Sequence, residues 1–117
     1  MSCRLLIVDD NRDSANSLAL VFSGRHEVRT AYDGEGALAL ALEFAPDVAI
    51  LDIMMPRMSG YRVGEILRER HPECEIIFFS GASTHEQTFS LGFKYHILKP
   101  VDPNELLRLV GEKCRGK

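Results

Sequence analysis

The chain has 117 residues, a length that suits one domain and cannot hold two full hydrophobic cores. Hydrophobic residues make up 45% of it and charged residues 26%, the mix of a soluble globular protein. The formal net charge of -3 argues against a nucleic-acid-binding domain, and no apolar run approaches the roughly 20 residues that span a bilayer. We therefore expect one domain over 1–117, ordered over about 4–115, that binds neither nucleic acid nor a membrane.

Apolar runs and amphipathic stretches alternate along the whole sequence. In chain order, the pattern predicts a strand over 4–8, a helix over 13–22, a strand over 27–31, a helix over 36–44 and a strand over 47–51. It continues with a helix that opens at Ser59-Gly60 and ends before Pro72, a strand over 75–79 and a strand over 95–98. A last helix follows, with Asp102 as its N-cap and Pro103 in its first turn.

This alternation predicts an α/β fold with one parallel sheet covered by helices on both faces. Such sheets place their ligand sites at the carboxyl ends of the strands, beside the point where the strand order reverses. The residues that follow each strand are therefore the first candidates for function.

Polar side chains stand at four of these strand ends. Asp9 and Asp10 follow the first strand, Asp52 the third, Ser80 the fourth and Lys99 the fifth. In the strand order 2-1-3-4-5 the first and third strands are neighbours, so the three carboxylates share one pocket. Asp52 ends an apolar run, and a buried carboxylate costs several kcal/mol unless it is paired, protonated or bound to a metal.

The shared pocket needs a cation or retained protons. At about 4 Å and an effective dielectric constant near 20, each pair of like charges costs roughly 4 kcal/mol. Carboxylate oxygens suit Mg²⁺, which keeps several waters and can then receive phosphate oxygens. Asp52 at the centre could attack phosphorus to give an acyl phosphate. Lys99 would neutralise the phosphoryl group, and the Ser80 hydroxyl could hydrogen-bond one of its oxygens.

The sequence resembles the receiver domains of two-component response regulators, which have a flavodoxin-like (βα)5 fold with strand order 2-1-3-4-5. The matching stretches are "LLIVDDN", "PDVAILDIMMPRMSG", "IIFFSGAS" and "YHILKP". The resemblance implies that Asp52 accepts a phosphoryl group from a sensor histidine kinase or phosphotransfer protein. It makes Asp10, Asp52 and the backbone carbonyl of Met54 direct Mg²⁺ ligands, with Asp9 acting through a metal-bound water. The reaction is self-catalysed, so the domain is not expected to be an enzyme in its own right.

The resemblance also implies a cytoplasmic protein with a downstream effector domain or protein, and a homodimer that forms on phosphorylation. Two features depart from the family pattern. His96 stands three residues before Lys99, where Tyr or Phe usually acts as the switch residue together with the Ser80 position. The segment between Ser80 and Lys99 is shorter than usual, which trims the fourth-helix region "STHEQTFSLGF".

Two alternatives remain beside the phosphoacceptor. The first is an interaction module on the same fold that works without phosphorylation, favoured by His96 and the short fourth-helix region. The second is a small phosphatase or hydrolase with Asp52 as nucleophile, although 117 residues leave no insertion for a substrate pocket. For the phosphoacceptor, Met54 and Ala82 offer no base for an attacking water, which predicts slow self-dephosphorylation.

The remaining cysteines, histidines and methionines are expected to be structural. Three cysteines, far apart and without CxxC spacing, predict free thiols in a reducing cytosol rather than a disulfide. Three histidines are expected at the surface: His26, His71 and His85. Three methionines are expected to pack near the turn after the third strand rather than to bind a metal or partner: Met54, Met55 and Met58.

Overall fold

The computed structural model describes residues 2–81 and 85–115. Its strands are β1 (Arg4–Val8), β2 (Glu27–Ala31), β3 (Val48–Asp52), β4 (Glu75–Ser80) and β5 (Tyr95–Leu98). Its helices are α1 (Arg12–Phe22), α2 (Gly34–Phe44), α3 (Gly60–Arg70), α4 (Glu86–Ser90) and α5 (Pro103–Cys114). Strands and helices alternate throughout the part of the chain that the structure describes, as the sequence pattern predicts.

All strand pairs in the sheet are parallel, in the order β2-β1-β3-β4-β5. This order confirms the predicted flavodoxin-like arrangement. The chain starts in β1, adds β2 on one side and then crosses back to β3 on the other side. The reversal puts the carboxyl ends of β1 and β3 next to each other, with β4 beside β3.

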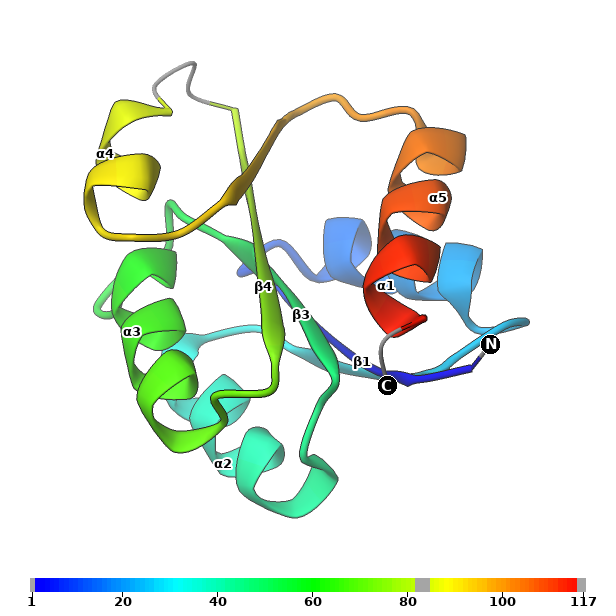
Figure 1. Ribbon diagram of the computed structural model, residues 1–117, viewed down its shortest axis with the longest axis horizontal. Helices are drawn as coiled ribbons and strands as arrows, with labels where there is room; N and C mark the ends of the chain where they lie inside the picture. The colour runs from blue at the N-terminus through cyan, green and yellow to red at the C-terminus, as the bar shows by residue number, and fades with distance from the viewer. Residues whose placement is uncertain (1, 82–84, 116–117) are drawn as a thin grey trace.

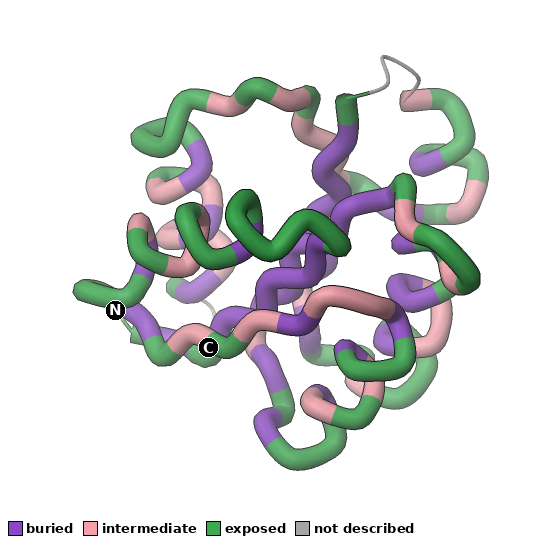
Figure 2. The backbone as a smooth tube through the Cα atoms, turned by 180° about the vertical axis from the view of Figure 1, so that it is seen from behind, coloured by how far each residue is buried: buried purple, intermediate pink, exposed green. Residues whose placement is uncertain are grey.

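The sheet is covered on both faces, and each face has its own hydrophobic core (Figure 1). Helices α1 and α5 lie on one face, where Phe22 and Leu106 pack against strand residues such as Ile50. Helices α2 and α3 lie on the other face, with α4 beside α3, and Leu67 packs there with Phe78. The buried strands run through the middle of the molecule and the outer sides of the helices face solvent (Figure 2).

The element boundaries agree with the sequence to within two residues. Strands β1, β2 and β5 have the predicted bounds, while β3 is shifted by one residue and β4 extends to Ser80. Helix α2 starts earlier than predicted because Asp33 is its N-cap, with its side chain accepting from the Gly36 N–H. Asp102 caps α5 as predicted, and Pro103 is in the first turn. Helix α4 has five residues, in line with the shortened segment.

Gly60 sets how closely α3 approaches the end of β3. A Cβ atom at this position would lie 2.1 Å from the backbone oxygen of Asp52, so any larger residue would push the helix away. The Gly60 N–H also donates to the Ile53 carbonyl at 2.9 Å. The start of α3 is therefore fixed directly beneath the carboxyl end of the central strand.

Two sequence predictions are wrong at the opposite edge of the sheet. Cys3 and Cys114 form a disulfide with a Cα–Cα distance of 5.8 Å, although 111 residues separate them. His26 is buried rather than at the surface, and its Nδ1 accepts a hydrogen bond from the Cys3 N–H. The spacing of Cys3, His26 and Cys114 in the sequence does not indicate these contacts. The three residues meet only because the sheet and α5 bring distant parts of the chain together. His71 and His85 are partly exposed.

Candidate functional site

Three carboxylates gather at the carboxyl edge of the sheet, as the strand order predicts. Asp9 and Asp10 follow β1, and Asp52 is the last residue of β3. Asp9 and Asp52 are buried, whereas Asp10 is exposed. Each offers one oxygen, and these oxygens all lie within 4.8 Å of one another. The cluster thus consists of hard oxygen donors at a spacing that suits a divalent cation.

Backbone contacts hold the two buried acids in place. The Asp9 N–H donates to the Ala31 carbonyl of β2 at 3.1 Å, and one Asp9 carboxylate oxygen accepts the Asn11 N–H at 3.0 Å. Asp52 pairs in register with Phe79 of β4, and the next N–H, of Ile53, donates to the Phe79 carbonyl. The backbones of Asp9 and Asp52 are therefore held side by side at the end of the sheet.

Lys99 supplies the positive charge of the cluster. Its Nζ lies 3.2 Å from Asp9 Oδ2 and 3.6 Å from Asp52 Oδ2. The ammonium also lies 4.9 Å from the centre of the Phe79 ring, a cation–π contact that limits its positions. The Lys99 N–H donates to the Ser80 carbonyl at 2.8 Å, which ties the loop after β5 to the end of β4. One lysine thus bridges two of the three acids.

Burial raises the pKa of Asp52 to about 6, since the charged carboxylate loses its hydration. The nearby Asp9 carboxylate raises the pKa further, while the Lys99 ammonium and a hydrogen bond from the Met54 backbone lower it. The upward effects win because burial is the largest of them and the single Lys99 ammonium offsets only part of it. The site therefore lacks positive charge, and it would gain stability from a cation.

The remaining predicted residues lie around this cluster. Ser80 ends β4 and is buried, one residue beyond the partner of Asp52 in the sheet. Met54 follows Asp52 by two residues, and the prediction that it packs is wrong, because its side chain is 70% exposed. The predicted packing role holds for Met55 and Met58, which are partly buried against the core. Ala82 lies outside the described residues.

His96 contacts another group of residues instead of the acids. It pairs in register with Phe78, and its Nδ1 lies 2.7 Å from the Thr88 Oγ1 of α4. The Thr88 hydroxyl, which is fully buried, also hydrogen-bonds the Tyr61 hydroxyl of α3. The His96 and His85 rings are 4.4 Å apart, centre to centre. His96 thus connects β5 with α3 and α4.

Sequence reasoning missed Tyr61 and Thr88. Tyr61 occupies an inward position of α3 and resembles an ordinary core aromatic, and Thr88 lies in a segment with no helical periodicity. The hydroxyl groups of Tyr61 and Thr88 were the only indication in the sequence, because a buried hydroxyl on the inward side of a helix usually needs a hydrogen-bond partner. The identity of that partner depends on where α4 packs, which the sequence pattern does not give.

Comparisons with known proteins point to one family. The family model described as "Response regulator receiver domain" matches residues 5–111. The chain is 36% identical to response regulator PleD of Caulobacter vibrioides, covering 100% of this chain and 27% of the relative. It is 34% identical to transcriptional regulatory protein DltR of Streptococcus agalactiae, covering 96% of this chain and 52% of the relative.

A solved structure has the same fold over nearly the whole chain. It is a CheY-like response regulator receiver domain protein from Methanospirillum hungatei, with a TM-score of 0.89 and 28% sequence identity. The match covers 97% of this chain and 94% of that one. By contrast, the chain spans between about a quarter and about half of the length of PleD and DltR.

The raised pKa of Asp52 predicts a pH-dependent stability. The folded state holds the proton up to about pH 6, whereas the unfolded chain releases it near 3.8. The wild type should therefore lose on the order of 2 to 3 kcal/mol of stability as the pH rises through this window, in the absence of divalent cations. Asp52→Asn cannot ionise and should be more stable than the wild type at pH 7.

Urea unfolding between pH 4 and pH 8 in the presence of a chelator measures this difference. The gap between Asp52→Asn and the wild type should close as the pH approaches 4. Asp13→Asn is the matched control, because it removes one exposed carboxylate outside the cluster. Parallel pH profiles for wild type and Asp52→Asn would contradict the raised pKa.

Proposed function

The chain belongs to the response regulator receiver domain family, and on that premise we propose that it accepts a phosphoryl group on Asp52. The supporting observation is the buried Asp52 carboxylate, flanked by two acids and contacted by Lys99. The donor would be the phosphohistidine of a sensor histidine kinase or phosphotransfer protein in the cytoplasm. Since the family match spans 5–111, we treat 1–117 as one receiver domain.

The transfer needs little covalent chemistry from the protein. An Asp52 carboxylate oxygen attacks phosphorus, the bond from phosphorus to the donor imidazole nitrogen breaks, and the imidazole leaves with its electron pair. Lys99, already 3.6 Å from Asp52, would neutralise a phosphoryl oxygen. The Ser80 hydroxyl, at the adjacent strand end, would hydrogen-bond another phosphoryl oxygen. Positioning and charge neutralisation are most of what phosphoryl transfer asks of a protein.

The donor set fits Mg²⁺. Its side-chain atoms are all carboxylate oxygens, and the shortage of positive charge around Asp9 and Asp52 leaves room for a divalent cation. We propose Asp10, Asp52 and the Met54 carbonyl as direct ligands, with Asp9 acting through a bound water. When bound, Mg²⁺ supplies positive charge that offsets the negative phosphoryl oxygens. No activity beyond self-phosphorylation and slow self-dephosphorylation is proposed for this domain.

The change at Asp52 would reach an effector domain or protein through β5 and α4. Movement of Ser80 toward the phosphoryl group would open space beside its neighbours on β5, and His96 could enter that space. The Thr88 hydroxyl now holds His96 Nδ1, so an inward movement must break or shift this hydrogen bond. The Thr88 hydroxyl also hydrogen-bonds the Tyr61 hydroxyl, so the same movement would change a contact that reaches α3. A phosphorylation-dependent homodimer would use the same rearranged surface.

A phosphorylation-independent interaction module remains the alternative. Its support is the five-residue α4 together with the hydrogen bond that fixes His96 to Thr88. The two proposals differ in one observable respect: the module needs no reaction at Asp52.

Asp52 should be the single phosphorylation site. Incubation with acetyl phosphate and Mg²⁺ should add one phosphate to the intact mass of the wild type and none to Asp52→Asn. Lys99→Ala should react at least about tenfold more slowly, since it removes the charge that offsets the phosphoryl oxygens. Asp13→Asn should react like the wild type. Equal labelling of Asp52→Asn would reject the assignment, and an unreactive, folded wild type would favour the interaction module.

Mg²⁺ should raise the melting temperature, because it relieves repulsion among the three acids. At about 100 times its dissociation constant, a ligand adds about 2.7 kcal/mol of stability. Asp10→Asn should lose most of this gain, whereas Asp13→Asn, with the same change in net charge, should keep it. Thermal unfolding with increasing MgCl₂ at constant ionic strength measures the effect. An undiminished gain in Asp10→Asn would exclude Asp10 as a ligand.

The Thr88 hydroxyl should restrain His96 in the unphosphorylated protein. Beryllofluoride with Mg²⁺, a phosphoryl mimic, should shift the NMR signals of the His96 ring. In Thr88→Val, which keeps the buried volume but lacks the hydroxyl, the His96 signals should lie nearer the activated values before the mimic is added. The His71 ring, at the end of α3, is the internal control. Identical His96 shifts with and without the mimic would show that the signal leaves by another route.

A further inference from the structure

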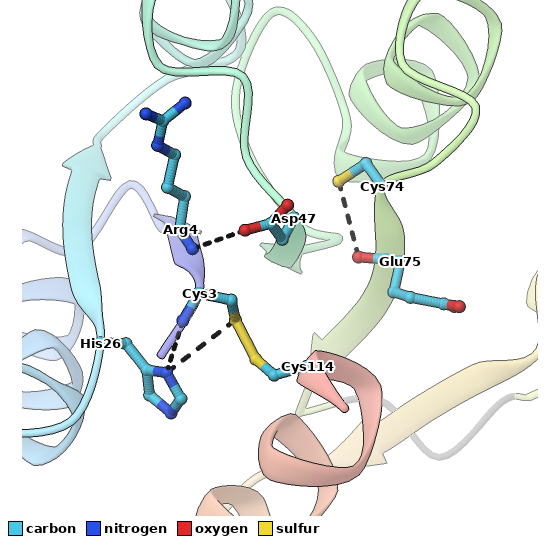
Figure 3. The surroundings of a disulfide bond; sticks show 7 residues. All are labelled: Cys3, Arg4, His26, Asp47, Cys74, Glu75 and Cys114. Carbon is cyan, nitrogen blue, oxygen red and sulfur yellow. Dashed lines mark hydrogen bonds between the residues drawn. A yellow bond between two sulfur atoms is a disulfide. The ribbon is translucent and has the colours of Figure 1, made fainter. Parts of the chain in front are cut away.

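A second cluster of reactive side chains lies at the amino edge of the sheet, away from the acidic site. Cys3 directly precedes β1, His26 directly precedes β2, and Cys114 is the last residue of α5. All three are buried, and the two cysteines form a disulfide (Figure 3). None of the three takes part in the proposed phosphotransfer.

The fold holds the cluster together through backbone contacts on both sides. The Glu27 N–H donates to the Cys3 carbonyl at 3.1 Å, which fixes the start of β2 against the residue before β1. The His26 N–H donates to the Phe22 carbonyl at the end of α1. Cys114 belongs to the same hydrophobic core as Cys3 and Phe22. Sheet hydrogen bonds and core packing therefore hold both cysteines in place alongside the bond between them.

His26 is oriented as a base toward Cys3. Its Nδ1 accepts the Cys3 N–H at 3.2 Å, so the Nδ1 lone pair faces Cys3 and the ring proton belongs on Nε2. The same Nδ1 lies 3.9 Å from Cys3 Sγ. Burial lowers the pKa of His26, and the positive charge of Arg25 lowers it further, so the imidazole is held in its neutral form, in which Nδ1 carries a free lone pair toward Cys3.

A cavity lies beside this cluster and reaches its base, His26. The cavity has a volume of about 360 Å³, and the rest of its lining is Ser2, Arg25, Leu107 and Gly111. Ser2 is the neighbour of Cys3, and Gly111 lies one helical turn before Cys114. The third cysteine, Cys74, is apart from this cluster: its Sγ contacts the Glu75 carbonyl (Figure 3).

We propose that Cys3 and Cys114 are a peroxide-reactive dithiol with His26 as the base for Cys3. In the reduced protein, His26 takes the Cys3 thiol proton and the thiolate attacks a hydroperoxide. A sulfur–oxygen bond forms, the oxygen–oxygen bond breaks, and the leaving alcohol takes the proton from His26. Cys114 then attacks the Cys3 sulfenic acid: the disulfide forms, and the displaced hydroxide leaves as water with the Cys114 proton. Overall, two thiols and one hydroperoxide give one disulfide, one alcohol and one water.

The product would fasten the beginning of β1 to the end of α5. A cross-link across 111 residues removes much of the freedom of the unfolded chain, so the oxidised form should be the more stable one. The acidic site lies at the other end of β1 and is not covalently changed. Oxidation would therefore set the stability of the domain and the attachment of α5, independently of Asp52.

The experiment starts from protein that has been reduced with dithiothreitol and then separated from the reductant. It measures how many cysteines remain as free thiols after oxidation. Addition of hydrogen peroxide, followed by alkylation in denaturant and intact mass measurement, should show one disulfide and one alkylated cysteine in the wild type. Cys74→Ser, the matched control, should form the same disulfide at the same rate. Cys114→Ser should stop at a Cys3 sulfenic acid that dimedone traps, whereas Cys3→Ser should give no dimedone adduct. The oxidised wild type should melt about 10 °C or more above the reduced one.

The variant His26→Asn distinguishes the role of His26 as a base from its role in holding the fold. The shorter amide can still accept the Cys3 N–H but cannot take a proton, so the melting temperature of the reduced protein should be retained. Disulfide formation should slow at least about tenfold. An unchanged rate in His26→Asn would reject the base, and three alkylated cysteines in peroxide-treated wild type would overturn the dithiol. Stoichiometric Zn²⁺ binding by the reduced wild type that blocks oxidation would make the cluster a metal site instead, and would equally overturn it.

Discussion

The structure depends on the burial of the Asp52 carboxylate next to that of Asp9, with one ammonium between them. Lys99 lies within 4 Å of both acids, yet burial and repulsion still raise the pKa of Asp52 to about 6. A site built only for stability would balance its charges, because uncompensated buried charge is costly. The shortage of positive charge around Asp9 and Asp52 favours the binding of a divalent cation. A phosphoacceptor needs this property, because the cation also offsets the charge of the incoming phosphoryl group.

Asp9, Asp52 and Lys99 meet because the strands that precede them are parallel. This explains why much of the site could be predicted from the sequence. Parallel strands end at one edge, and apolar runs mark where each strand ends. Asp9, Asp10, Asp52, Ser80 and Lys99 could thus be assigned to that edge from the sequence. Element boundaries shifted by one or two residues, at β3, at β4 and at helix starts such as that of α2, where Asp33 is the N-cap. These shifts do not move any predicted site residue to another edge.

The contacts that sequence analysis missed depend on how helices pack rather than on where strands end. Thr88 meets both Tyr61 and His96 only because α4 lies across α3 and β5. Cys3 and Cys114 meet because α5 runs back along the sheet to its amino edge. Their separation of 111 residues in the sequence therefore does not indicate that they are in contact. Side-chain pairs of this kind share no periodic signal. They depend on how the helices pack on the sheet, and the pattern of apolar residues along the sequence does not give that packing.

The two clusters stand at opposite ends of the same strand, and this placement bears on how they interact. Strand β1 is buried from Leu5 to Val8 between β2 and β3, so it behaves as a rigid element rather than a flexible connection. A rigid strand passes on no change unless it has a second arrangement to adopt. α4, by contrast, has only five residues and is joined to β5 through the Thr88–His96 hydrogen bond. On the proposed function, a signal from Asp52 would therefore travel through β4, β5 and α4, whereas the proposed oxidation of Cys3 and Cys114 would act on the stability of the whole domain.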